Sequence, residues 1–213
     1  MFWGTVSGPH QTGKQAATTA KRGQIAHTAY VAVVVPTYWR HYGPGNFLWF
    51  SDLALIGMVP ALWAEDRRLA SGLAVSVLLP ELPWNVGYFT RLFTGRELFG
   101  LSHYMFDRKK PLWLRALSLF HLWLPHLVVS SVRRLGYDRR ILGIQIIAGE
   151  LVLAASYALT RPEDNVNWVY GPGQKPQQKI PRRLYLAAVM LFFPICVWWP
   201  THRILRRLYF GAG

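Results

Sequence analysis

Apolar stretches long enough to cross a bilayer recur along the chain, separated by polar and basic connections. A helix needs about 20 predominantly apolar residues to span roughly 30 Å of hydrocarbon. Windows of that length predict six spans, at residues 25–39, 46–63, 69–88, 111–132, 140–159 and 184–201. Because only helices and closed barrels satisfy every backbone group in lipid, the pattern predicts an all-α, polytopic transmembrane bundle of about six helices.

The same pattern divides the chain into three parts. Residues 1–24 are a polar, basic N-terminal tail, residues 25–208 a transmembrane helical domain, and residues 209–213 a C-terminal tail. The N-terminal tail has no apolar core ahead of a small-residue cleavage site, so we do not expect a secretory signal peptide there.

Composition adds a strong positive charge to this picture. The chain has 24 Lys and Arg against 10 Asp and Glu, a formal net charge of +14. These basic residues flank the apolar runs and do not line a polar domain surface, so we expect anionic lipid headgroups as partners and no nucleic acid. The ten Trp and ten Tyr cluster near the ends of the runs, a placement typical of membrane interfaces.

Basic residues in short connections predict the orientation of the spans. The connections after the second and fourth spans hold six arginines, whereas the turn after the first span holds only Arg40. With six spans, both termini are therefore predicted on the cytoplasmic side. The two long connections on the other side, about 89–110 and 160–183, are also basic, so the rule is obeyed only in part.

Polar side chains in and beside the spans fall mostly in the half that faces away from the cytoplasm. A carboxylate in hydrocarbon is costly and usually faces a protein interior or a water-filled cavity. Their common depth predicts one polar pocket, although Asp52 or Glu81 could instead pair with Arg115 merely to neutralise buried charge. The pocket candidates are Asp52, Glu81, Asn85, Arg115, His121, Asp164, Asn165 and Asn167.

Besides His121, the ionisable residues His126 and Glu150 also lie in the predicted spans. His121 and His126 are five residues apart, about 140° round a helix, so they cannot share a metal and no metal site is predicted. Either imidazole could singly ligate a haem or chlorophyll-type pigment, or be a hydrogen-bonded core histidine. Glu150 lies mid-span, where it must be protonated, paired or exposed to a partner chain.

Two Gly-Pro-Gly turns echo each other along the chain. They occupy residues 43–45 and 171–173, and each follows a tyrosine. Glycine tolerates positive φ and proline fixes its own φ, so each turn enforces a tight reversal. Both are predicted on the side of the polar pocket.

Four segments carry a resemblance to a family of bacterial multi-pass proteins labelled only as membrane-associated. They are residues 38–52 (YWRHYGPGNFLWFSD), 79–85 (LPELPWN), 117–121 (LSLFH) and 162–173 (PEDNVNWVYGPG). The resemblance covers about residues 30–208 and implies a helical membrane fold but no activity. We expect a bacterial inner membrane, cytoplasmic or intracytoplasmic, as the location. The motifs coincide with the predicted pocket, which favours a functional role for it.

Two classes of function remain open. The first is a non-catalytic accessory subunit that stabilises a larger membrane complex with other subunits, for example a photosynthetic or respiratory one. The absence of a Gly-rich phosphate loop, a paired-Asp motif and a His-box cluster favours this class. The second is a membrane-embedded enzyme or transporter acting on a lipid or small molecule, with His121 as acid or base and Asp52 or Glu81 orienting it. Bound lipid, a chlorophyll-type pigment and a carotenoid are the candidate cofactors.

Overall fold

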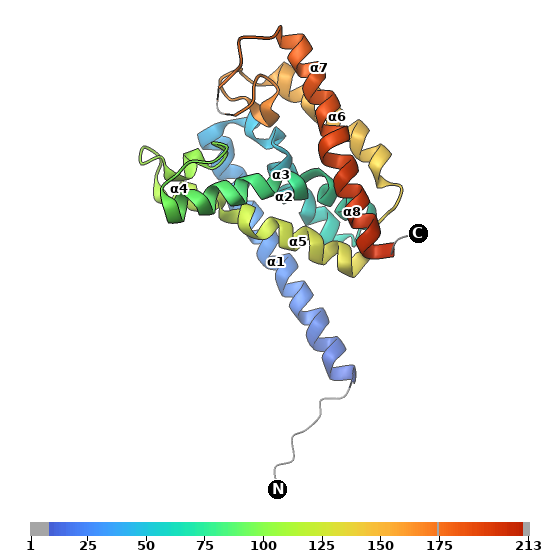
Figure 1. The fold of residues 1–213 in the computed structure, drawn as a ribbon. Helices are drawn as coiled ribbons and strands as arrows, with labels where there is room; N and C mark the ends of the chain where they lie inside the picture. The colour runs from blue at the N-terminus through green and yellow to red at the C-terminus, as the bar shows by residue number, and fades with distance from the viewer. Residues whose placement is uncertain (1–8, 174, 211–213) are drawn as a thin grey trace.

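The computed structural model describes residues 9–173 and 175–210, which form an all-helical bundle without strands (Figure 1). Six helical segments follow one another along the chain, as predicted. They are α1 (Pro9–Tyr42), α2 (Phe50–Trp63), α3 (Arg67–Thr94), α4 (Leu112–Ala116) continued through the 3₁₀ turn η3 (Leu117–Leu119) into α5 (Phe120–Leu135), α6 (Ile141–Leu159), and α7 (Arg182–Phe192) continued through the π-helical η5 (Phe193–Trp198) into α8 (Trp199–Phe210).

Four of these segments are long and apolar enough to cross a membrane, which fits a multi-pass membrane protein. They are Arg67–Thr94, Leu112–Leu135, Ile141–Leu159 and Arg182–Phe210. Helix α1, which contains the span predicted at 25–39, is not among them. The span predicted at 46–63 is met only in part, because the Gly-Pro-Gly turn leads into the 3₁₀ helix η1 (Pro44–Leu48) and α2 has 14 residues. At 1.5 Å per residue α2 is about 21 Å long, shorter than a bilayer core.

Helix α3 occupies the centre of the bundle and packs against α2, α5 and α6. It begins where the Asp66 carboxylate accepts hydrogen bonds from the backbone N–H groups of Arg68 and Leu69, a standard N-cap. It ends at Gly95, whose φ of 71° suits a glycine after a helix. Its buried face is rich in Ala, Ser and Gly, which allows the neighbouring helices to approach closely.

Helix α1 joins the predicted N-terminal tail to the first predicted span. It runs without a break through residue 24, so the boundary between tail and span is a change in composition and not in secondary structure. Its C-terminal half packs against α2, where His27 Nε2 lies 2.9 Å from the Leu55 carbonyl oxygen. Its N-terminal part projects beyond the other helices (Figure 1). Residues 1–8 and 211–213 lie outside the described part.

The two arginine-rich short turns lie together at one end of the bundle. Arg68 Nε, after α2, is 3.3 Å from the Asp138 carboxylate in the turn between α5 and α6. Arg139 of that turn lies over the Phe210 ring, 3.8 Å from its centroid, which brings the end of α8 to the same place. These contacts confirm that the two turns share one side of the bundle.

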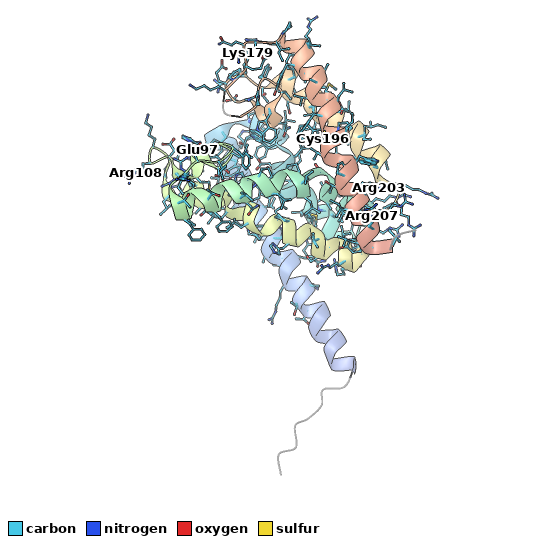
Figure 2. All side chains as sticks on the ribbon, in the orientation of Figure 1. Glu97, Arg108, Lys179, Cys196, Arg203 and Arg207 are labelled. Carbon is cyan, nitrogen blue, oxygen red and sulfur yellow. The ribbon has the colours of Figure 1, made fainter. Side chains whose placement is uncertain are left out.

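The long connections gather at the opposite end. One cavity there is lined by residues 101, 104 and 110, by the Gly-Pro-Gly turn at 43–45, and by residues 159–161 and 163–168. The last helical segment runs between these two ends. In Figure 2, Lys179 before α7 lies at one end, and Arg203 and Arg207 on α8 lie towards the other. The side on which the sequence analysis predicts the pocket therefore corresponds to one end of the helical bundle.

Candidate functional site

A cavity of about 630 Å³ opens among the connections at this end of the bundle. Its walls come from the end of α1, η1, the first turn of α2, the middle of α3, the 101–110 connection, the start of α5 and the loop after α6. Exposed lining residues such as His41 and Arg161 mark the mouth, and the buried Asp52, Glu81 and His121 mark the floor. The structure therefore brings these three ionisable residues of the spans into one pocket.

His121 and Glu81 form a buried pair across α5 and α3. His121 Nδ1 lies 2.8 Å from Oε2 and 3.0 Å from Oε1 of the Glu81 carboxylate, and Glu81 is only 3% exposed. The imidazole is held between the rings of Trp84 and Phe120, with centroids 4.3 and 4.2 Å away. With Nδ1–H donated to Glu81, the ring is fixed and Nε2 is left to accept or release a proton.

Asn85 holds the two helices together beside this pair. Pro125 has no backbone N–H, so it cannot supply the helical hydrogen bond to the carbonyl of His121 four residues earlier. The Asn85 side chain replaces that donor, with Nδ2 3.0 Å from the His121 carbonyl oxygen and 2.9 Å from that of Glu81. Asn85 is thus a positioning residue of the pair and does not line the cavity.

Asp52 is the second carboxylate at the floor of the cavity. It lies in the first turn of α2, where the positive end of the helix dipole favours an anion. Its side chain is 5% exposed and accepts one hydrogen bond, from Asn46 Nδ2 at 3.3 Å. No ion pair within the described residues reaches it.

The predicted neutralisation of Asp52 or Glu81 by Arg115 is wrong. Arg115 donates instead to the backbone carbonyls of Met105, at 2.7 Å, and Lys110, at 3.1 Å. It fixes the connection before α4 and does not line the cavity. The carboxylates of the pocket are therefore left without a guanidinium partner from α4.

The loop after α6 forms one wall and is held by two buried asparagines. Asn165 donates to the Gly171 and Gly173 carbonyls and accepts from the Tyr170 N–H, which closes the loop on itself. Both asparagines and Trp168 have positive φ, 41°, 51° and 60°. Such backbone strain in non-glycine residues persists only where the surroundings enforce it, and it clusters at functional sites.

Asn167 ties this loop to the helix that carries Asp52. Its Nδ2 donates to the Leu48 carbonyl at 2.7 Å and to Ser156 Oγ at 3.1 Å. Its Oδ1 accepts from the Phe50 N–H at 3.2 Å, so it caps the N-terminus of α2 from a distant segment. Asn165 and Asn167 thus both line the pocket as predicted, and Asp164 lies at its exposed rim.

The sequence analysis missed several polar lining residues, among them Tyr38, Ser118, Tyr104 and Lys110. The hydroxyls of Tyr38 and Ser118 lie 2.7 Å apart, and both residues fall inside the motifs that carry the family resemblance. Tyr104 and Lys110 come from the connection before α4, which carries no periodic signal. Burial raises the pKa of Tyr104, which therefore stays a protonated phenol, and burial lowers the pKa of Lys110.

The remaining candidates lie away from the cavity. His126 is on the exposed side of α5, on a different face from His121, so the two cannot share a ligand. Among the described residues no group of three His, Cys, Asp or Glu is placed to hold a metal ion. Glu150 lies in the tenth position of the 19-residue α6, and its Oε1 is buried without a hydrogen-bond partner.

The two Gly-Pro-Gly turns meet the prediction for their location. Residues 43–45 and Gly173 all line the cavity, and Gly43 and Gly173 have φ of 78° and 91°. Together the walls offer a fixed imidazole, two buried carboxylates and several hydroxyl groups around a space large enough for a small organic molecule. Comparison with protein-family models, with curated proteins and with solved structures found no match, so the resemblance to the membrane-associated family stays a prediction.

Proposed function

We propose that this protein is a multi-pass membrane protein that binds a small molecule or a lipid headgroup in the cavity, where His121 accepts or donates a proton. The observation that carries the proposal is the buried His121–Glu81 pair at the floor of a cavity of about 630 Å³. An oriented histidine next to a carboxylate is a common general acid–base arrangement. The site suits either an enzyme or a proton-coupled transporter.

The arrangement of the polar groups supports a site over simple charge neutralisation. A structural ion pair needs a cation beside each carboxylate, yet Arg115 bonds to backbone and Asp52 has only an amide partner. Leaving a buried charge without a countercharge destabilises a fold. A loss of folding stability of this kind is typical of functional sites, where perturbed titratable groups gather in a cleft.

Native mass spectrometry of the protein purified in mild detergent from its own membranes tests the proposal. We expect the wild type to retain a small molecule or lipid, and the Glu81→Gln and Asp52→Asn variants to lose it. Glu97→Gln is the matched control, because Glu97 pairs with Arg91 and His103 outside the cavity. An empty wild type, or equal occupancy in all four proteins, would count against a binding site.

We also propose the orientation and location that the arginines support. The arginine-rich turns lie at one end of the bundle and the pocket at the other. The positive-inside rule then puts the turns and both termini in the cytoplasm of a bacterial cell, and the pocket at the outer side of the inner membrane.

A second candidate function, an accessory subunit of a larger membrane complex, rests on Glu150. This carboxyl lies at the middle of α6, beside the exposed Ile147 and Leu151. A polar group at that depth is costly unless a neighbouring chain pairs with it. Blue-native electrophoresis of mild-detergent extracts tests this: wild type should migrate as a large assembly that Glu150→Ala disrupts, whereas a free monomer in both cases contradicts the subunit role.

A further inference from the structure

The cavity is acidic although the chain as a whole is strongly basic. The formal charge of the protein is +14 and it has only ten carboxylate side chains, yet four of them line this one space. Of the Lys and Arg side chains that the structure describes, two do so, although the chain has 24 such residues. The charged lining residues, histidines aside, are Asp52, Glu81, Glu163, Asp164, Lys110 and Arg161.

The pairing among these groups leaves Asp52 without a countercharge. Arg161 Nε is 3.2 Å from the Asp164 carboxylate at the rim, and Glu81 has His121. Asp52, deep in the cavity, has only the uncharged Asn46 amide. A buried carboxylate is stabilised by a nearby positive charge, and among the described residues no Lys, Arg or His side chain forms an ion pair with Asp52.

Aromatic faces complete a surface that suits an organic cation. Six Tyr and Trp side chains from five segments line the cavity: Tyr38, Tyr42, Trp49, Trp84, Tyr104 and Trp168. The ammonium group of Lys110 already lies over two of them, 4.6 Å from the Tyr42 ring centroid and 5.7 Å from that of Tyr104. Aromatic rings attract cations through their negative faces, most strongly where water is excluded.

One buried hydroxyl of the lining is left for a ligand. The Tyr42 hydroxyl makes no hydrogen bond within the described residues, whereas Trp84 pairs with the Tyr104 hydroxyl. Buried polar atoms are usually paired, and a hydroxyl can both donate and accept, so the Tyr42 hydroxyl is suited to bond with a polar atom of a ligand.

From these four observations we infer that the cavity takes a small organic cation, an amine or a quaternary ammonium compound that also carries a hydroxyl or another hydrogen-bonding group, with its positive charge beside Asp52. This inference names the ligand class of the site and rests on the proposed function. The headgroup of a zwitterionic lipid and a free amino alcohol share this chemistry.

Choline and its uncharged isostere 3,3-dimethylbutan-1-ol separate charge from shape. Both carry a hydroxyl group and a branched head of nearly equal size, but only choline is positively charged. Thermal unfolding of the detergent-purified full chain is followed against the concentration of each compound, since a ligand of the folded state raises the melting temperature. We expect choline to bind at least about tenfold more tightly than the isostere.

The Asp52→Asn variant tests the position of the charge. Its choline Kd should rise by about tenfold or more, while Glu97→Gln, which removes a carboxylate outside the cavity, should bind as the wild type does. Vesicles of phosphatidylcholine and of phosphatidylglycerol added to the same assay identify a headgroup source if only the first competes with choline. Absence of choline binding, equal binding of the isostere, or an unchanged Kd in Asp52→Asn overturns the inference. A co-purified ligand found by native mass spectrometry would still support the proposed function in that case.

Discussion

Replacing Asn85 by alanine should expose the structural consequence of a proline four residues after His121. Among the described residues, Asn85 is the one side chain that donates to the His121 carbonyl, whose helical donor is already missing because residue 125 is a proline. A buried carbonyl left unpaired costs about 1–3 kcal/mol. For a chain of this length we expect the melting temperature to fall by about 2–12 °C.

The double variant Asn85→Ala, Pro125→Ala makes the reasoning refutable. Alanine at position 125 restores a backbone N–H to the His121 carbonyl, so Asn85→Ala should cost much less in that background than in the wild type. The general gain in stability from removing a helical proline cancels in the four-protein cycle, as does the lost bond to Glu81. The melting temperatures of all four proteins are measured in the same detergent. If Asn85→Ala lowers the melting temperature equally with Pro125 and with alanine at that position, the proposed role of this hydrogen bond is refuted.

Two other substitutions test the helix packing and the arginine-rich turns. A Cβ atom on Gly149 would lie 2.2 Å from Cη2 of the fully buried Trp198, so Gly149→Ala should destabilise the protein by about 1–3 kcal/mol. The control is Gly143→Ala on the same helix, whose Cβ atom would meet nothing within 4 Å and which should be neutral or stabilising. Equal melting temperatures of the two variants would contradict this expectation. The N–H of Arg140, and then nearby guanidinium groups, hold the pKa of Asp138 below its usual range. That stabilisation is complete above about pH 4 and is lost as the pH falls through the lowered pKa of the folded state. The advantage of wild type over Asp138→Asn should therefore shrink in acid, and a gap that stays constant from about pH 7 to about pH 3 would show that the group does not act this way.

The sequence was most informative where apolar periodicity and depth determine the structure. Spans three to six appear as helices because each is long and apolar, and the common depth of Asp52, Glu81 and His121 along their helices correctly predicted that they meet. Asn85 follows Glu81 by one helical turn, so its position beside the Glu81–His121 pair could also be predicted from the residue spacing.

Other features depended on tertiary contacts that spacing does not encode. Arg115 has a long, flexible side chain, and it reaches carbonyl groups of an irregular connection whose path only the folded structure defines. Tyr104 and Lys110 enter the cavity from that same connection. The polar tail was predicted as a segment separate from the first span, yet both belong to one helix. Polar residues disfavour burial in lipid but do not prevent a helix, and the alanines at 16, 17 and 20 favour one.

The proposed site requires a water-accessible cavity lined by ionisable residues of several spans. The reactivity of one introduced thiol tests most directly whether water reaches this cavity. In a Cys196→Ala background, since Cys196 is exposed (Figure 2), Ser118→Cys places a thiol in the cavity wall and Leu124→Cys places one in the core of the same segment. A membrane-impermeant, cationic methanethiosulfonate reagent should modify the Ser118→Cys variant in intact membranes at least about tenfold faster than the Leu124→Cys variant, and faster than its anionic counterpart does. Equal, slow modification of both variants would show that no such cavity is open to water.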